Sequence, residues 1–193
     1  MPDGLRDRKK ASTQALLRVS ALRLFSERGF AAVSVDAIAT EANVSRSTFF
    51  RYFGSKEAVL FSEVDESGNV FLSALEARPD EEGPWKAFEE ALLVTSLEAM
   101  SRTTEEEQRL VDDLLRNDPV LTGRRLKELS RWTGLIANVF ARRAGRSAPE
   151  LQDRLAASTC MAVSEEVGRV WHENPDSDAS ELIRRAFELI RAF

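Results

Sequence analysis

The chain has 193 residues, of which 43% are hydrophobic and 31% are charged, and its formal net charge is −5. A chain of this length can bury a sizeable core without disulfides. Its single cysteine, Cys160, excludes an intrachain disulfide and suits a reducing cytoplasm. The charged N-terminus is not followed by an apolar run, and no stretch of about 18 apolar residues occurs. We therefore expect neither a signal peptide nor a membrane-spanning helix.

Cap and turn residues divide the chain into nine expected helices, and no strand alternation competes with them. The expected helices cover residues 12–28, 34–43, 45–54, 56–76, 118–145, 147–174 and 178–193, with two more beginning near 84 and near 104. Thr104 with Glu107, and Ser147 with Glu150, have the spacing of capping boxes. Before the first helix, Arg6 to Lys10 form a basic arm, which is either a solvated terminus or a segment that reaches a DNA minor groove.

Residues 34–60 are the most informative part of the chain, because they predict two short helices joined by a tight turn. Ser34 and Ser45 are the expected N-caps of these helices. Ile38 and Ala39 point inward, and the small Ala39 lets the second helix cross closely. Asn43 is expected to leave the first helix with a positive φ, which asparagine tolerates second only to glycine.

The second short helix has an apolar face and a polar face. Phe49 and Phe53, four residues apart, are expected to point inward. The outward residues are Arg46, Ser47, Thr48, Phe50, Arg51 and Tyr52. A short helix with hydroxyls, arginines and a tyrosine outside is typical of a helix that enters a DNA groove.

Lys56 lies in the first turn of the next expected helix, where the helix dipole disfavours a cation. Two interpretations are open. A DNA phosphate bound at this helix end removes the penalty, or Glu57 and bulk water are sufficient.

These residues resemble the DNA-binding segment of the TetR family of bacterial transcriptional regulators, over about residues 12 to 62. The matching positions are Phe25, Gly29, Phe30, Ser34, Val35, Ile38, Ala39, Ala42, Val44, Ser45, Thr48, Phe49, Tyr52, Phe53, Lys56 and Glu57. The chain departs from the family in having Asn43 in place of the usual glycine, and Phe50 in place of the usual tyrosine.

The resemblance implies roles for individual residues. Thr48, Tyr52 and Lys56 would contact phosphates, whereas Arg46, Ser47 and in one interpretation Arg51 would face base edges. Phe50 lacks the hydroxyl that touches a phosphate in the family, so we expect a packing contact with sugar and backbone there. The predicted DNA-binding set is Ser34, Ser45, Arg46, Ser47, Thr48, Phe50, Arg51, Tyr52 and Lys56.

The net negative charge conceals an uneven distribution. Residues 1–62 hold ten Lys and Arg against six Asp and Glu, whereas residues 63–193 hold seventeen against twenty-six. A basic head on an acidic body fits a protein that meets phosphates with one part only. We expect an all-α protein with a helix-turn-helix DNA-binding domain over 1–55 and a helical effector-binding and dimerisation domain over 56–193, linked by the helix at 56–76.

A single recognition helix contacts few base pairs, so we expect a homodimer that binds a pseudo-palindromic operator in double-stranded DNA. The resemblance implies that the last two helices form a four-helix bundle between subunits, although both could be ordinary core. The expected interface residues are Leu151, Leu155, Val163, Val167, Val170, Leu182, Ala186, Phe187 and Ile190.

The middle helices are rich in aromatic residues and Met, which suits either an apolar cavity for a small effector or a packed core. The expected effector contacts are Trp85, Phe88, Leu92, Ser96, Met100, Trp132, Ile136, Phe140 and Met161, with Thr95 and Asn138 as further polar groups.

The expected function is a cytoplasmic, ligand-responsive transcriptional regulator, a repressor released by an apolar or amphipathic effector. One alternative is a regulator that answers to a protein partner, and another is a helical enzyme using Asp112 and Asp113. The adjacent carboxylates fit a solvated face better than a metal site, and His172 is the only histidine. We therefore expect no catalytic residues, no metal and no cofactor.

Overall fold

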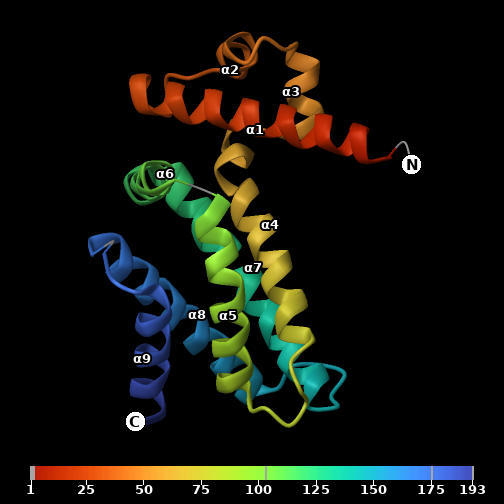
Figure 1. Cartoon of the computed structure of the whole chain (residues 1–193), viewed down its shortest axis with the longest axis vertical. Helices are drawn as coiled ribbons and strands as arrows, with labels where there is room; N and C mark the ends of the chain where they lie inside the picture. Colours follow the sequence, from red (N-terminus) through yellow and green to blue (C-terminus); the bar gives the residue numbers. More distant parts are fainter. Residues whose placement is uncertain (1–2, 103, 175, 193) are drawn as a thin grey trace. The chain divides into compact units, whose positions relative to one another are not determined.

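The protein is described here by a computed structural model that covers residues 3–102, 104–174 and 176–192. Over these residues the chain is helical without strands, as expected (Figure 1). The helices are α1 (Asp3–Arg28), α2 (Val35–Glu41), α3 (Arg46–Tyr52), α4 (Lys56–Glu76), α5 (Pro84–Arg102), α6 (Glu105–Asn117), α7 (Pro119–Arg143), α8 (Leu151–Glu173) and α9 (Ala179–Ala192).

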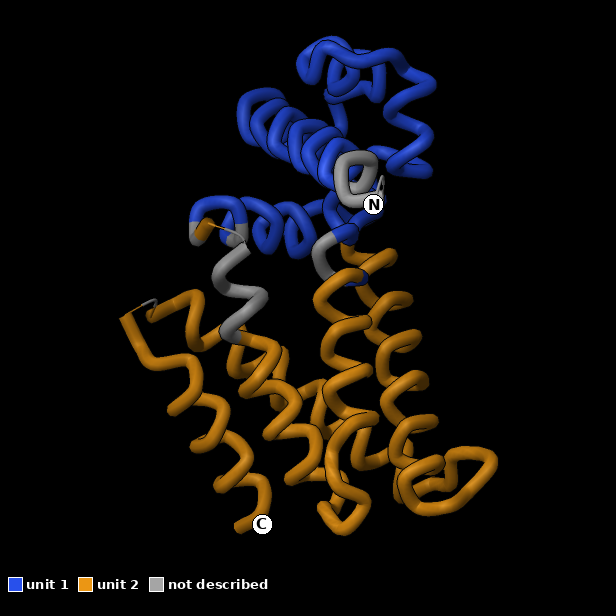
Figure 2. Tube along the Cα trace, turned by 45° about the vertical axis from the view of Figure 1, so that its right-hand side comes forward, with its two compact units in different colours: residues 1–65, 105–121 blue, residues 66–104, 122–193 orange. Residues whose placement is uncertain are grey.

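The chain divides into two compact units, and each unit has its own core (Figure 2). Unit 1 consists of residues 1–65 and 105–121, and unit 2 of residues 66–104 and 122–193. Their boundary runs through α4 and α7, so these two helices contribute residues to both units.

The core of unit 1 is built by the first three helices, the start of α4 and α6. Phe25, Ile38, Phe49 and Leu60 are almost completely buried there. From α6 and the start of α7 the same core takes Val111, Leu115 and Leu121. Burial of these three side chains explains why α6 belongs with the N-terminal helices.

This division differs from the expected boundary at residue 55. An ion pair between Arg18 of α1 and Glu107 of α6, at 3.4 Å, adds a polar contact to the apolar ones. The acidic α6 also changes the charge argument, because residues 1–65 and 105–121 together hold twelve Lys and Arg against fourteen Asp and Glu. Unit 1 as a whole is therefore not basic, and the expectation of a basic head is wrong for the unit that folds together.

The core of unit 2 is centred on Phe88 of α5. Its ring packs against Phe71 of α4 at 4.8 Å between centroids and against Phe187 of α9 at 5.8 Å. Ile136 and Phe140 of α7 are also buried in this core. Helices α4, α5, α7, α8 and α9 thus share one apolar interior.

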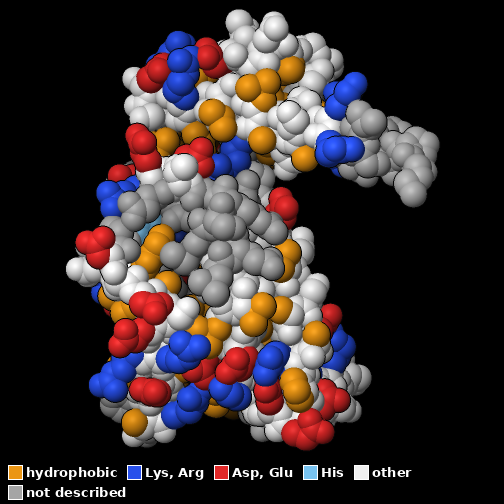
Figure 3. Space-filling model, viewed as in Figure 1, with side chains coloured by type: hydrophobic (Ala, Val, Ile, Leu, Met, Phe, Trp, Pro, Cys, Tyr) orange, Lys and Arg blue, Asp and Glu red, His pale blue; other side chains and the backbone are white. Residues whose placement is uncertain are grey.

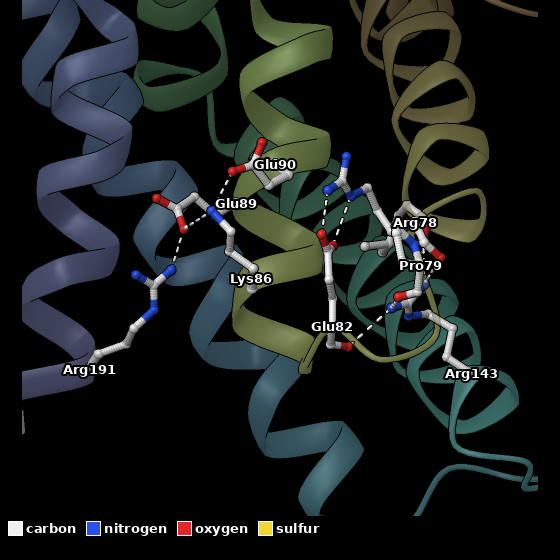
Figure 4. A network of polar contacts seen from close by, with 9 residues as sticks. Arg78, Pro79, Glu82, Lys86, Glu89, Glu90, Arg143 and Arg191 are labelled. Carbon is white, nitrogen blue, oxygen red and sulfur yellow. Dashed lines mark hydrogen bonds and ion pairs between the residues drawn. The ribbon is translucent and has the colours of Figure 1, made fainter.

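Ion pairs and side-chain hydrogen bonds fix the ends of the unit 2 helices. Arg143 donates hydrogen bonds to the backbone carbonyls of Arg78, at 2.5 Å, and Pro79, at 2.6 Å, and so holds the loop between α4 and α5 (Figure 4). On the other side of α5, Arg191 of α9 pairs with the buried Glu89. Figure 3 shows acidic and basic side chains interspersed over this part of unit 2, as expected for a solvated surface.

Two helix starts differ from the predictions. Helix α1 begins at Asp3, so the residues expected to form a basic arm are its first turns. The capping box of α8 is formed by Glu150 and Asp153, not by Ser147 and Glu150. The start of α7 agrees with the prediction, because the Asp118 carboxylate caps it by accepting a hydrogen bond from the backbone N–H of Val120 at 2.9 Å.

Within the described ranges, none of the helices combines the length and the apolar composition that a bilayer crossing requires.

Candidate DNA-binding site

The turn between α2 and α3 is built by three polar residues, each in its predicted role. The Ser34 hydroxyl accepts a hydrogen bond from the Ala37 amide at 3.1 Å, and Ser45 accepts one from Thr48 at 3.0 Å. Asn43 has φ 51°, the left-handed conformation expected at the end of α2. The two helices therefore form a helix-turn-helix whose geometry is set by the local sequence.

Helix α3 has one buried face and one exposed face, as its sequence predicts. Phe49 is completely buried and Phe53 at its C-cap is nearly so. Because these two side chains fix the inner face, Arg46, Ser47, Phe50 and Arg51 must point outward, and all four are exposed. The Phe50 side chain is 45% exposed even though it is a large apolar ring.

The exposed residues of α3 already have partners in the free protein. Arg46 Nη1 lies 2.5 Å from Asp36 Oδ2, and its guanidinium stands 5.4 Å from the centroid of the Phe50 ring. Arg51 lies over the Tyr52 ring at 5.2 Å. An ion pair as exposed as that of Arg46 is worth about 0–1 kcal/mol, so DNA can displace Asp36 at little cost. Asp36, which is not among the residues predicted from the sequence, therefore holds Arg46 in the absence of DNA.

Ser47 and Thr48 both lie close to the N-cap hydroxyl of α3. Ser45 Oγ is 2.8 Å from Ser47 Oγ and 2.9 Å from Thr48 Oγ1. A hydroxyl can rotate and can both donate and accept a hydrogen bond. Ser47 and Thr48 can therefore still make the contacts expected of them, with a base edge and a phosphate respectively.

Lys56 is placed differently from the expectation. Its ammonium nitrogen lies 2.7 Å, 3.3 Å and 2.8 Å from the carbonyl oxygens of Phe30, Ala31 and Val33, and 4.4 Å from the centre of the Phe30 ring. An ammonium has three N–H donors, and three carbonyls surround it. A lysine at this helix start therefore needs no bound phosphate to explain it.

The residues expected to line an effector cavity form much of the unit 2 core. Phe88, Ile136 and Phe140 are buried, and Trp85, Leu92 and Met161 pack against them. The hydroxyls of Thr95 and Ser96 donate to carbonyls of their own helix, at 2.9 Å and 3.3 Å, and Asn138 is exposed. The side chain of Met100 lies outside the described residues. The packed interior was the alternative left open by the sequence.

A pocket of about 420 Å³ lies elsewhere in unit 2, between the α4–α5 loop and the α7–α8 loop. Its lining includes Glu82, Arg143, Arg146 and Asp153, and Phe140 is the one expected effector residue in it. The expectation that the aromatic set surrounds a cavity is therefore not met by this pocket.

The expected interface residues divide into buried and exposed members. Phe187 is completely buried and Val163 nearly so, and both belong to the unit 2 core, so the prediction that they face a second subunit is wrong. Val167, Ala186 and Ile190 pack partly against the same core, and Val170 and Leu182 are half-buried. Leu151 and Leu155 are 72% and 58% exposed, and Leu189, which was not predicted, is also exposed.

The alternative of a helical enzyme finds no support in the surroundings of its candidate carboxylate Asp112 or of Cys160. Asp112 forms an ion pair with Arg116 on α6 at 3.9 Å. Across the side chains that the structure describes, His, Cys, Asp and Glu make no group of three suited to a metal ion. Burial raises the pKa of the Cys160 thiol far above its usual range, which keeps it unreactive.

A helix-turn-helix with an exposed, arginine-bearing second helix defines this protein as a helical DNA-binding protein. Residues 17–62 match the sequence profile of the family described as "Bacterial regulatory proteins, tetR family", and residues 82–193 match that of the "MftR C-terminal domain". The chain belongs to the TetR family, and it is a DNA-binding transcriptional regulator.

Two relatives match almost the whole chain. The HTH-type transcriptional regulator TcmR of Streptomyces glaucescens is 32% identical, over 96% of this chain and 84% of its own length. MftR of Mycobacterium tuberculosis, a candidate regulator of mycofactocin biosynthesis, is 25% identical, over 96% of this chain and 92% of its own length.

Solved structures share the fold. The SmeT–triclosan complex has a TM-score of 0.64 at 19% identity and covers 94% of this chain and 90% of that chain. Thermus thermophilus FadR, a TetR-family repressor in complex with lauroyl-CoA, has a TM-score of 0.57 at 23% identity and covers 92% of this chain and 93% of that chain. At these identities the likeness shows a common architecture.

Proposed function

We propose that two copies of this chain bind a pseudo-palindromic operator through α3 and act as a repressor that a small effector releases. The observation that carries the proposal is the exposed face of α3, where Arg46, Ser47, Phe50 and Arg51 stand above the buried Phe49. Such a face can present a guanidinium to guanine and an apolar ring to sugar or thymine methyl groups. Lys56 is left out of the proposed contacts, because its donors face carbonyls of its own unit.

The small size of α3, which has seven residues, supports binding as two subunits, because one such helix contacts few base pairs. Two such helices must lie about 34–36 Å apart, or a multiple of it, to enter successive major grooves. The surface proposed for dimerisation is the exposed apolar part of α8 and α9, formed by Leu151, Leu155 and Leu189. These side chains do not belong to the unit 2 core, so they are available to a partner.

The effector response follows from the fold and from the ligands of related structures. SmeT was solved with triclosan, which is largely apolar, and FadR with lauroyl-CoA, whose lauroyl chain is apolar although its CoA part is charged. The apolar interior of unit 2 suits an effector of the same character. An effector acts in proportion to its preference for the conformation that does not bind DNA. We place the protein in the bacterial cytoplasm, where its DNA is.

Gel retardation of the DNA upstream of the protein's own gene tests the proposal. The expected result is a specific complex that weakens steeply with salt and is lost on addition of an apolar effector. Retardation that does not distinguish this DNA from a scrambled duplex would rule out operator binding. If specific binding occurs but no compound changes the melting temperature or the retardation, the regulator answers to another signal, such as a protein partner.

A further inference from the structure

Phe50 is an apolar ring on the exposed face of α3, and two neighbouring side chains hold it in place. The residue is 45% exposed. The buried Phe49 meets it edge to face, with ring centroids 5.5 Å apart and ring planes at 89°. On α3 one turn earlier, the guanidinium of Arg46 lies 5.4 Å from the Phe50 centroid. The ring is therefore held between a core side chain and a cation, at one place on the surface of the helix.

Arg46 can keep this contact while it binds a base. A guanidinium has five N–H donors. Among the residues that the structure describes, one hydrogen bond uses this group, from Nη1 to Asp36 Oδ2 at 2.5 Å. A cation–π contact depends on the charge of the guanidinium and leaves its donors unused. Donors of Arg46 therefore remain for the O6 and N7 acceptors of guanine in the major groove.

The contact between the two side chains sets the depth at which the Phe50 ring meets DNA. Arg46 and Phe50 are four residues apart, so they lie on the same face of α3. When the guanidinium reaches a guanine edge, a ring beside it lies among the base edges and not at the phosphates. Stacked bases repeat about every 3.4 Å along a strand, so the observed 5.4 Å corresponds to one or two base-pair steps.

One chemical group in the major groove matches an apolar ring. The base edges present hydrogen-bond donors and acceptors there, and thymine adds a C5-methyl group. The base 5-methylcytosine carries the same methyl group at the same ring position. Because the Phe50 ring has no hydroxyl, it offers no hydrogen bond to a phosphate oxygen or to a polar base edge. Contact with a methyl group is the interaction through which it can favour one base over another.

We propose that Arg46 and Phe50 form one reading unit, which recognises a guanine together with the 5-methyl group of a pyrimidine one or two base pairs away. The inference rests on the proposed binding of operator DNA through α3, and it names bases that this binding requires. In unmodified DNA the methyl group belongs to thymine. In methylated DNA it also belongs to 5-methylcytosine, so methylation of a cytosine at this position strengthens binding.

Selection of duplexes from a randomised pool by the full chain provides the DNA for the test. In each half-site we expect a guanine whose replacement weakens binding of the wild type but not of Arg46→Ala. A thymine should lie within two positions of this guanine, on either strand.

Two pairs of duplexes then isolate the methyl group. Deoxyuridine in place of the thymine removes the methyl group and keeps the base pair. Binding should weaken about fourfold when one half-site is changed, and about fifteenfold when both are changed. Cytosine and 5-methylcytosine at the same position form the second pair. The methylated duplex should bind more tightly than the unmethylated one by the same factor.

Two variants of α3 show whether Phe50 is the residue that contacts the methyl group. Phe50→Ala removes the ring and introduces a good helix former, and it should bind the thymine and deoxyuridine duplexes equally. Arg51→Ala is the matched control, because Arg51 is an exposed residue of the same helix that lies over Tyr52 instead. It should weaken binding of both duplexes and keep their ratio. Circular dichroism and denaturant unfolding check that both variants are folded.

The inference is overturned if no thymine lies within two positions of the guanine, if the members of either pair bind equally, or if Phe50→Ala keeps the ratio. Equal binding of thymine and deoxyuridine by the wild type would place the Phe50 ring against sugar and backbone. A selection that enriches no sequence at all would contradict the proposed function, and this inference with it. Enriched half-sites without dependence on the methyl group would leave the proposed function intact and refute the reading unit alone.

Discussion

The ammonium nitrogen of Lys56 lies 2.7 Å from the carbonyl oxygen of Phe30, so the first turn of α4 is tied to the loop that follows α1. The carbonyl of Val33, at 2.8 Å, completes the attachment on the other side. The half-buried Lys56 is therefore a structural link within unit 1, at a position where the resemblance to the family implied a contact with a DNA phosphate.

Replacing Lys56 by Ala is expected to destabilise unit 1, because two or three carbonyls lose their donor. We expect the free energy of unfolding to fall by about 1–3 kcal/mol, measured by denaturant unfolding. The dependence of DNA affinity on salt should keep its slope. Arg51→Ala, which removes an exposed cation of α3, serves as the control and should lower the slope. A slope lowered by about one in Lys56→Ala, with unchanged stability, would instead identify a phosphate contact.

Arg46→Ala is expected to weaken binding at one base pair of each half-site. The loss should be about 1–3 kcal/mol at that position and small elsewhere, measured by retardation of operators with single substitutions. Asp36→Asn is the companion variant, since it frees Arg46 from its ion pair and removes a negative charge near the DNA. It should raise affinity without altering the preferred base. Equal losses of Arg46→Ala on all sequences would assign Arg46 to the phosphate backbone.

Leu155→Asp is expected to separate the subunits, because it places a charge on the apolar surface proposed for dimerisation. Light scattering should report a monomer, and operator binding should be lost with the paired recognition helices. Leu126→Asp on α7 is the control, because its side chain is similarly exposed at 61% against 58% for Leu155. A dimer that survives Leu155→Asp would place the interface elsewhere.

Phe187→Ala is expected to destabilise the protomer, since its ring is completely buried and packs on Phe88. Removing such a ring costs about 3–5 kcal/mol, and denaturant unfolding should show the loss. The loss should persist when the protein concentration is raised, whereas an interface residue would show a loss that dilution increases. Arg184→Ala, at an exposed position of the same helix outside the proposed dimer surface, should cost far less.

Glu82→Gln is expected to flatten the acid dependence of stability. The Arg78 guanidinium, which donates a hydrogen bond of 2.9 Å to the carboxylate, holds the pKa of Glu82 below its usual range. The ionised pair therefore contributes its full stability above the ordinary glutamate pKa of about 4.3. That contribution is lost as the pH falls through the lowered value. The melting temperature of the wild type should exceed that of Glu82→Gln at neutral pH, and this difference should shrink as the pH falls. Glu81→Gln is the neighbouring control, and parallel curves for Glu82→Gln would contradict the expectation.

The sequence predicted the helix-turn-helix almost residue by residue, because local chemistry decides it. Ser34 and Ser45 are caps whose hydroxyls satisfy backbone donors within three residues, and Asn43 adopts the conformation that its side chain tolerates. Phe49 and Phe53 lie four residues apart at the end of the short helix α3, and both are buried. Such features need no knowledge of distant contacts.

The errors concern contacts between distant parts of the chain. From its position in the sequence, α6 was expected in the C-terminal domain over residues 56–193. The burial of Val111 and Leu115 in the unit 1 core assigns it to unit 1 instead. Phe187 lies on an apolar stripe that fits a neighbouring helix of the same chain as well as one of a partner. An apolar stripe on a helix indicates that this face is buried. Whether another helix of the same chain or a partner subunit buries it depends on the tertiary structure.

The place of α6 bears on any attempt to exchange recognition modules between relatives. A fragment that stops at Asp65 would leave Leu17, Phe25 and their neighbours without the three apolar side chains supplied from Val111 to Leu121. A chimera that takes residues 1–65 from one parent must therefore take residues 105–121 from that parent too, although they lie some forty positions further along the chain.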